Sequence, residues 1–347
     1  MVPTPAPAEE ARRLESLRAL HLLDTPAEAR FDRFTRLAAR LLKAPVAVIA
    51  LVDEARVFVK SALGTTVGEV PRDASFAGAS ILGDDPLVVS DAEKDPRFAK
   101  NPLVSADPPV RFCAAAPLRA PDGSRVGALC VFDLKPRRLA EEDRLALLDL
   151  AALAEHELPV ERMHPTQSEL VVGRDAKERS EMIDPVTRTW GRAAIRDFLA
   201  RELSRASRQQ TPIGLARADL DGMARLRKER GAEASDAILH EAARRIRAAL
   251  RPYDAVGRYA DDGFLLILPG SDSLNTMKAI DRVRALVQVK PVPVPGGTVP
   301  VTLSVGVAAS ESPGRADVEA LIRAVSGALL QARQRGGNRV ELSGTRF

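Results

Sequence analysis

The sequence predicts an α+β fold in two domains, because its two halves carry different orders of helix and strand. Its 347 residues are enough for two domains that each bury a core. In the first half, apolar strands joined by short turns lie between helices, which is typical of an antiparallel sheet with flanking helices. In the second half the order is β-α-β-β-α-β with one added element, the order of a ferredoxin-like palm.

The composition argues against several classes of function. The 51 basic and 47 acidic side chains give a net charge of only +4, and aromatic residues make up 4%, so no nucleic-acid partner is expected. Cys113 and Cys130 have no CxxC spacing, which disfavours a zinc site or a disulfide framework. No apolar run approaches the roughly 18 residues of a membrane span, and the N-terminus lacks a secretory signal pattern. We therefore expect a cytoplasmic protein with no membrane partner.

The first domain is expected over residues 14–158. Residues 1–13, which include a Pro/Ala-rich stretch, are expected to form a disordered N-terminus, although leucines at helical spacing favour a helix over 9–21. The box Thr25-Pro26-Ala27-Glu28 predicts that the next helix begins there, with proline at its first position. The strands are predicted at residues 45–52, 56–60, 87–89, 111–118 and 125–133, and the last helix at 140–156.

This half resembles a GAF domain. The resemblance is carried by LLDTPAEARFDRFTRLAARLLKAPVAVIALVDEARVFVKS, by DPRFAKNPLV and by RFCAAAPLRAPDGSRVGALCVFDLKPRRL. It implies a small-molecule pocket over the sheet, or a dimerisation module. Many relatives carry Cys-Ala-His after the residues that match Asp73 and Phe76, but here the segment reads Ala77-Gly78-Ala79, without a thiolate or imidazole. We expect a ligand that is either lost or not readable from sequence, and Cys130 as a buried small hydrophobic residue rather than a reactive thiol.

The second domain is expected over residues 184–343. Residues 159–183 are polar and predict a linker; a dimeric signalling helix is the alternative, but sustained heptads are missing. A hairpin is expected around an Asp262-Gly263 turn, since this dipeptide between apolar runs is a strong turn signal. The helices are predicted at residues 191–205, 235–250, 275–287 and 316–335, and the other strands at 213–221 and 299–307.

These elements, with the residues in them, resemble a GGDEF domain, the diguanylate cyclase fold related to nucleotidyl cyclase palms. The match runs from Asp184 to Val340 through ADLDGM, RYADDGF, LSVGVA and ALLQARQRGGNRV. The resemblance implies that two protomers each hold GTP with Mg²⁺ and join them into cyclic di-GMP, a reaction that needs metal carboxylates and a phosphate clamp. Asp219 and Asp262 match the metal-binding acids, and Asp236 matches a guanine reader.

Other active-site positions depart from the family pattern. The signature reads Ala260-Asp261-Asp262-Gly263-Phe264, so aspartate replaces its second glycine and glycine replaces its catalytic glutamate. The guanine-reading asparagine is Arg227, one phosphate lysine is Ala224, a second matches Arg333, and an expected arginine is Gly337. We therefore expect a catalytically degenerate domain in which Asp219, Asp262 and Asp236 are vestigial. Asp219 and Asp262 would hold a metal only if GTP and Mg²⁺ binding were retained.

A second site is implied upstream of the signature. In this family the product inhibits at an Arg-x-x-Asp motif five residues before the signature, and Arg251-Pro252-Tyr253-Asp254 stands at that distance. Arg282 falls at the position of a further arginine from the following helix. Arginine donates to phosphates and base edges in pairs, and Asp254 can accept from guanine. The alternative is that Arg251 and Asp254 are solvated charges at a helix end.

The sequence therefore predicts a homodimeric signalling protein whose degenerate GGDEF domain binds cyclic di-GMP through Arg251, Asp254 and Arg282. It would relay occupancy to an unknown protein partner and require no cofactor. Two alternatives stay open: an active diguanylate cyclase working through Asp219, Asp262 and Asp236, and a dimerisation scaffold that binds no nucleotide. A further variant keeps GTP, with Mg²⁺, at Asp219 and Asp262 as an allosteric input.

Overall fold

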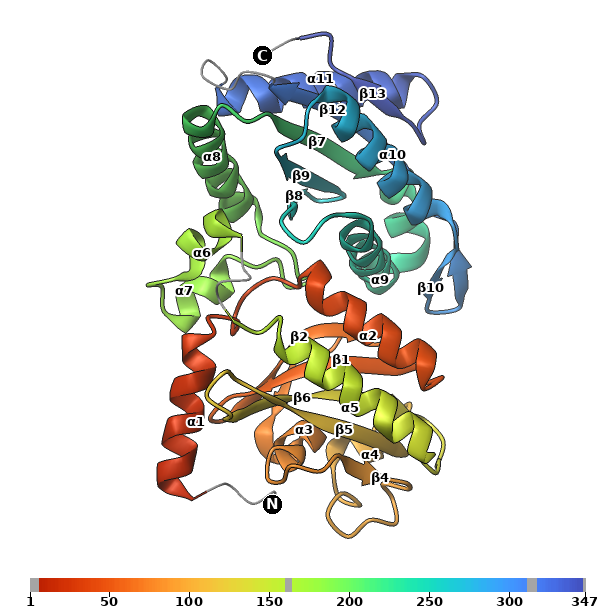
Figure 1. Ribbon diagram of the computed structural model, residues 1–347. Coiled ribbons are helices and arrows are strands. Elements are labelled where there is room, and N and C mark those ends of the chain that lie inside the picture. The colour runs from red at the N-terminus through yellow and green to blue at the C-terminus, as the bar shows by residue number, and fades with distance from the viewer. Residues whose placement is uncertain (1–5, 160–163, 311–316, 346–347) are drawn as a thin grey trace. The chain divides into compact units, whose positions relative to one another are not determined.

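The computed structural model describes residues 6–159, 164–310 and 317–345 (Figure 1). The chain divides into two compact units, with the boundary between residues 163 and 164, and each unit is described by itself. Both contain a largely antiparallel sheet with helices packed on it, so the predicted α+β, two-domain class is confirmed. None of the helices within the described ranges is long and apolar enough to cross a membrane.

The first unit is built on a six-stranded antiparallel sheet in the order β3-β2-β1-β6-β5-β4. Helices α2 and α5 lie side by side on one face (Figure 1), and α3 packs on β5 and β6. The strands are β1 (Val46–Val52), β2 (Arg56–Leu63), β3 (Glu69–Pro71), β4 (Leu87–Val89), β5 (Phe112–Arg119) and β6 (Arg125–Asp133), and the helices are α1 (Pro7–Ala19), α2 (Ala29–Leu41), α3 (Phe76–Ser80), α4 (Pro102–Ser105) and α5 (Glu141–Glu155).

Aromatic rings fill the core on the α3 face of this sheet. Phe76 stacks on Phe98 with ring centroids 4.4 Å apart and meets Phe132 edge-on at 5.8 Å. Cys113 and Cys130 are fully buried in the same core, and burial raises the pKa of Cys130 to about 12. Since the thiolate is the reactive form, Cys130 is an inert core residue, as the sequence indicated.

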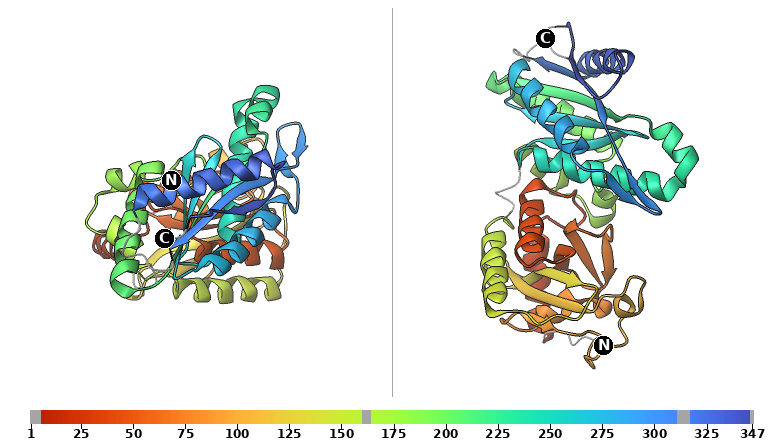
Figure 2. Two further views of the ribbon diagram at one scale, coloured as in Figure 1. Left: turned by 90° about the horizontal axis from the view of Figure 1, so that it is seen from above. Right: turned by 90° about the vertical axis from the view of Figure 1, so that its right-hand side faces the viewer.

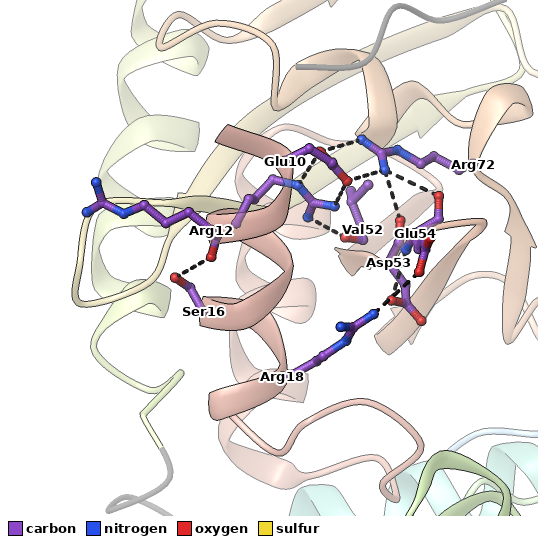
Figure 3. A network of polar contacts seen from close by, with 9 residues as sticks. Glu10, Arg12, Ser16, Arg18, Val52, Asp53, Glu54 and Arg72 are labelled. Atoms are coloured by element: carbon purple, nitrogen blue, oxygen red, sulfur yellow. Dashed lines mark hydrogen bonds and ion pairs between the residues drawn. The ribbon is translucent and has the colours of Figure 1, made fainter. Parts of the chain in front are cut away.

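Helix α1 begins inside the stretch expected to be disordered. That expectation is wrong for residues 7–13, whereas residues 1–5 lie outside the described ranges. Glu10 accepts hydrogen bonds from Arg13 at 2.6 Å and Arg72 at 2.5 Å, and Arg13 also donates to the carbonyl of Val52 (Figure 3). Burial acts to raise the pKa of Glu10, but the bonds and charges of both arginines outweigh it and lower the pKa to about 2. This network ties the helix to the sheet.

The second helix begins later than its sequence signal predicts. The prediction of a capping box at Thr25 is wrong, because α2 begins at Ala29 and no side chain caps its first turn. The Thr25 hydroxyl instead donates to the carbonyl of Leu22 and accepts from the buried ammonium of Lys60. The Glu28 carboxylate lies 2.6 Å from the Lys60 ammonium and neutralises it. Because Glu28 is held in this ion pair, it does not cap the helix.

The second unit has a five-stranded sheet in the order β13-β12-β7-β9-β8, antiparallel except for β13, which runs parallel to β12. Its main core lies between the sheet and helices α9 and α10, whereas α8 packs on β8 and α11 on β12 and β7. The strands are β7 (Ile213–Leu220), β8 (Ala255–Ala260), β9 (Gly263–Pro269), β12 (Leu303–Ser310), β13 (Val340–Leu342) and the separate hairpin β10 (Val292–Val294) and β11 (Gly297–Val299), and the helices are α8 (Arg192–Gln209), α9 (Met223–Ala249), α10 (Ser273–Gln288) and α11 (Val318–Gln334).

Helix α9 is longer than predicted and is bent. It begins at Met223 rather than near Ser235, and Gly231, with φ 82°, divides it into two parts that meet at an angle (Figure 2). Glycine adopts this backbone conformation without strain, so the bend falls there. The bend separates the residues of the first part from those of the second, which affects the site described below.

The predicted linker contains two short helices, α6 (Pro165–Val171) and α7 (Ala176–Glu181). Helix α6 packs on α8, buries Leu170 and Val171, and Thr166 donates to the buried carboxylate of Glu202. The first of these helices is therefore part of the second unit's packing. Residues 160–163 of the predicted linker lie outside the described ranges.

Candidate functional site

The turn between β8 and β9 differs from its prediction by one residue. The turn residues are Asp261 and Asp262, and Gly263 already belongs to β9, where it pairs with Asp219 of β7. A Cβ at Gly263 would lie 1.8 Å from Oδ1 of Asp219. Gly263 therefore lies against the Asp219 carboxylate, which would have to move to admit a side chain, and it does not have the positive φ that an Asp-Gly turn needs.

Two carboxylates lie next to each other at this turn, and each is paired with an arginine. Asp219, at the end of β7, is 5% exposed and accepts from Arg333 of α11 at 2.6 Å. Asp262 forms a close ion pair with Arg227, from the first part of α9. The side chains brought together are thus the two predicted metal-binding acids and the two arginines that stand at a guanine-reading and a phosphate-binding position.

Burial dominates the electrostatics of Asp219. Desolvation raises its pKa above the usual range, and the nearby charges of Asp262 and Asp221 raise it further, while Arg333 and Arg217 act in the opposite direction. Its Oδ1 is buried and accepts no hydrogen bond from any residue that the structure describes. An aspartate in this setting depends on Arg333 to remain ionised.

The third acid at this end of the sheet serves the fold. Asp221 accepts from the hydroxyls of Thr302 at 2.7 Å and Ser304 at 2.6 Å, and from the backbone N–H of Asn338 at 3.1 Å. It thereby joins the end of β7 to the loop after α11. Gly337 in that loop has φ 74°, a backbone conformation that glycine adopts without strain.

The remaining predicted residues of this site are exposed. Asp236 lies in the second part of α9, beyond the bend at Gly231, Ala224 lies in the first part, and Asp261 lies in the turn beside Asp262. Among the described residues, no group of three His, Cys, Asp or Glu side chains is arranged to hold a metal. Since both available carboxylates already hold a guanidinium group, the residues as they stand do not fit Mg²⁺.

The second predicted site lies at the other end of α9. After α9 ends at Ala249, Asp254 accepts from the backbone N–H of Arg251 at 2.8 Å, and its own N–H donates to the Arg251 carbonyl at 3.1 Å. Arg282 of α10 donates to the carbonyl of Ala249 at 2.9 and 3.2 Å. The two guanidinium groups therefore gather where the helix dipole favours positive charge.

The electrostatics of this second site centre on the carboxyl group of Asp254 and the two arginines near it. Desolvation raises the pKa of Asp254 to about 6, and the hydrogen bond from Arg251 and the charges of Arg251 and Arg282 only partly offset it. Both arginine side chains are exposed. The structure therefore brings Arg251, Asp254 and Arg282 together at the surface, with two cations around one acid.

Sequence reasoning missed one neighbour of these residues. Tyr253 is 41% exposed, its hydroxyl accepts from Arg251 at 3.3 Å, and its ring centroid lies 6.0 Å from the Arg251 guanidinium carbon. The signal that could have found it is an aromatic side chain inside the Arg-x-x-Asp motif of a chain with only two tyrosines. An exposed aromatic ring beside a guanidinium offers a surface on which a base can stack.

The comparisons with known proteins agree with both resemblances. The family model "GAF domain" matches residues 26–158, and "Diguanylate cyclase, GGDEF domain" matches residues 181–339. Two curated relatives come from Pseudomonas aeruginosa. "Cyclic di-GMP phosphodiesterase PA2567" is 30% identical over 272 residues, covering 78% of this chain and 43% of the relative. "Diguanylate cyclase DgcP" is 27% identical over 224 residues, covering 65% and 33%.

Solved structures include the GGDEF domain of DgcB from Caulobacter crescentus in complex with c-di-GMP. It is 24% identical, covers 50% of this chain and 97% of its own, and has a TM-score of 0.45. This chain spans less than half the length of the two curated relatives. The matched models account for most of both compact units, so the chain consists of a GAF domain followed by a GGDEF domain.

Proposed function

We propose that the GGDEF domain binds cyclic di-GMP through Arg251, Asp254 and Arg282 and relays its occupancy to a protein partner without turning over GTP. The observation that carries the proposal is the grouping of these three side chains at the exposed end of α9. A guanidinium donates in pairs to phosphate oxygens or to the edge of a base. The Asp254 carboxylate would accept from the N1–H and amino group of guanine.

The surroundings of Asp219 and Asp262 support a function without turnover. A phosphoryl-transfer site needs free carboxylates to hold its metal ions. Here Arg333 and Arg227 pair with both of them. Position 263 carries glycine where the family signature has its catalytic glutamate, so this carboxylate is missing.

The named relatives support cyclic di-GMP as the ligand class. One is described as a cyclic di-GMP phosphodiesterase and others as diguanylate cyclases. These names concern proteins of which this chain covers less than half. Their activities therefore suggest which nucleotide to test rather than which reaction to expect.

Calorimetric titration of the full chain with cyclic di-GMP tests the proposal. We expect binding in the native chain and a loss of about tenfold or more in affinity for Arg251→Ala, because a charged hydrogen bond contributes about 1.5–3 kcal/mol. Arg284→Ala is the matched control, since Arg284 lies on α10, the helix that carries Arg282, but pairs with Asp281 and Asn338. Absence of binding, or equal affinity for Arg251→Ala and the control, contradicts the proposal.

The same preparation separates the two alternatives. Incubation with GTP and Mg²⁺ followed by nucleotide chromatography identifies an active cyclase by the appearance of cyclic di-GMP. A nucleotide-free scaffold is identified by an unchanged melting temperature with cyclic di-GMP and with GTP. Stabilisation by GTP without product indicates that GTP acts as an allosteric input at Asp219 and Asp262.

A further inference from the structure

Arg217 lies in the middle of the GGDEF-domain sheet. It is on β7, which has a strand on each side, and its cross-strand partners are Leu265 of β9 and Gly306 of β12. Cross-strand partners point to the same face of a sheet, and Gly306 lies against the backbone of α11. The Arg217 side chain therefore points to the face on which α11 packs, where it is half-buried. A guanidinium group that loses water in this way needs a compensating partner.

Arg217 makes no salt bridge with any residue in the described ranges. Its Nη1 donates to the Ser326 hydroxyl at 2.8 Å, and that hydroxyl donates to the carbonyl of Ile322 at 2.6 Å. Its Nε is buried and donates to none of the described residues. Asp219, two positions along the same face of β7, forms its salt bridge with Arg333 and acts on Arg217 only at longer range. A neutral group thus orients Arg217, which keeps its charge and one buried donor for a ligand.

Two arginines of α8 contact the same tyrosine as Arg217. The ring centroid of Tyr259, a buried residue of β8, lies 5.5 Å from the guanidinium carbon of Arg217 and 5.1 Å from that of Arg192. Arg196 donates to the Tyr259 hydroxyl at 3.3 Å and pairs with Glu319 of α11, so these two charges cancel. Arg192 is exposed, and it has no salt bridge to a described residue. Two positive charges therefore lie beside one ring without an acid to pair with either.

We propose that Arg192 and Arg217 bind a phosphate group beside Tyr259, as inorganic phosphate or as the monoester of a small molecule. Such a group carries a charge of about −1.5 to −2 at pH 7, which matches the two guanidinium charges. Each guanidinium donates in pairs to phosphate oxygens, and the buried Nε of Arg217 gains the acceptor that it lacks. We call these three residues the Arg217 site.

Other anions match the Arg217 site less well. A carboxylate carries a single charge, and so does each phosphodiester group of cyclic di-GMP, so either would leave one guanidinium charge without compensation. The Arg217 site shares no residue with the proposed cyclic di-GMP site at Arg251, Asp254 and Arg282. The inference therefore goes beyond the proposed function and does not rest on it.

Calorimetric titration of the full chain with inorganic phosphate tests the site. In a chloride buffer of constant ionic strength, we expect saturable binding with a dissociation constant of about 1 mM or tighter. Arg217→Met keeps a long side chain but removes the charged hydrogen bonds, so it should weaken binding about tenfold or more. Arg192→Ala, a change at an exposed position, should weaken it about fivefold or more.

The matched control is Arg208→Ala. Arg208 is exposed in the last turn of α8, about 24 Å along the helix from Arg192, so this variant should bind phosphate as the native chain does. A titration with glycerol 3-phosphate separates the two sources of the phosphate group. Equal affinity identifies a site for monoesters and tighter binding of inorganic phosphate a site for the free anion, and both results support the proposal. Acetate at the same concentrations should not bind.

Thermal unfolding gives an independent measurement. Without phosphate, Arg217→Met should melt at or above the temperature of the native chain, because it removes a buried donor that has no acceptor. With phosphate at about ten times its dissociation constant, the native chain should melt about 2–4 °C higher. The melting temperature of Arg217→Met should stay unchanged at that concentration.

Three results would overturn the inference. The first is an absence of saturable phosphate binding, the second is equal affinity for phosphate in Arg217→Met and Arg208→Ala, and the third is acetate binding as tight as that of phosphate. Two crossed titrations separate this inference from the proposed function. Arg251→Ala should bind phosphate as the native chain does, and Arg217→Met should bind cyclic di-GMP as the native chain does, so either proposal can fail without the other.

Discussion

The GGDEF domain carries two charged clusters that use their charges in different ways. At the β8–β9 turn, the acids Asp219 and Asp262 each hold an arginine of the same chain. At the end of α9, the guanidinium groups of Arg251 and Arg282 contact a tyrosine hydroxyl and a backbone carbonyl, and within the described ranges neither is in a salt bridge, although both lie near Asp254. We infer from this contrast that a charged residue at a family binding position can bind a ligand only when no neighbouring residue of the chain already pairs with it.

The largest expected effect is on the affinity for cyclic di-GMP, which should depend on the arginines at the end of α9 and not on those at the β8–β9 turn. Replacing Arg251 and Arg282 together by alanine should lower the affinity for cyclic di-GMP about 100-fold or more, because two sets of charged hydrogen bonds are lost. Replacing Arg227 and Arg333 together should change it by less than about threefold. Calorimetry of both double variants measures the contrast, and the opposite ranking would place the nucleotide at the β8–β9 turn.

The second effect concerns the glycine that faces Asp219. Gly263→Ala should lower the free energy of unfolding by about 2 kcal/mol, since the new methyl group forces the Asp219 carboxylate away from Arg333. In an Asp219→Ala background the same change should cost less than about 0.5 kcal/mol. Urea denaturation of the four chains gives this coupling.

A second glycine supplies the control for that measurement. Gly327, in α11, has open space where a Cβ would lie, so Gly327→Ala should stabilise the chain by about 0.5–1 kcal/mol. Equal costs of Gly263→Ala with and without Asp219 would show that the close approach is not the reason for glycine at position 263.

Most strands and helices could be predicted from the sequence because their signals are local. Apolar alternation and helical spacing located β1, β6 and α5 to within one residue or two. The start of α2 could not be predicted, because Glu28 is held by Lys60, which is distant in sequence. The turn at Asp261-Asp262 is displaced for a similar reason, the contact between Gly263 and Asp219 of another strand.

The two candidate sites also differ in whether their contacts join residues that are close or distant in sequence. Arg251 and Asp254 are three residues apart, and one helix end and one turn bring them together. The pairs of Arg227 with Asp262 and Arg333 with Asp219 join residues separated by 35 and 114 positions. No local pattern predicts such pairs, although both arginines stand at positions where the family has other residues. Substitutions at ligand-binding positions are therefore best examined for a new partner within the chain.

The third effect is a dependence on pH of the affinity for cyclic di-GMP, caused by Asp254 at the end of α9. With a pKa of about 6, Asp254 is mostly ionised at pH 7.5 and mostly protonated at pH 5. Protonation removes the acceptor for guanine, so the affinity for cyclic di-GMP should fall about tenfold between these pH values. Titrations of the native chain and of Asp254→Asn measure this. The variant should bind weakly with little dependence on pH, whereas a native affinity that rises toward pH 5 contradicts the assigned role of Asp254.

The smallest expected effect is the response to a divalent cation. Because Arg227 and Arg333 occupy the carboxylates, Mg²⁺ should leave the melting temperature of the native chain unchanged. With both arginines replaced by alanine, Asp219 and Asp262 are released, and Mg²⁺ at about ten times its dissociation constant should stabilise the variant by about 1.4 kcal/mol, or about 4 °C. Arg284 and Arg335, replaced together, are the control, because they pair with other acids. A shift of equal size in the native chain would show that the arginines yield to the metal, and would favour the active cyclase over the sensor.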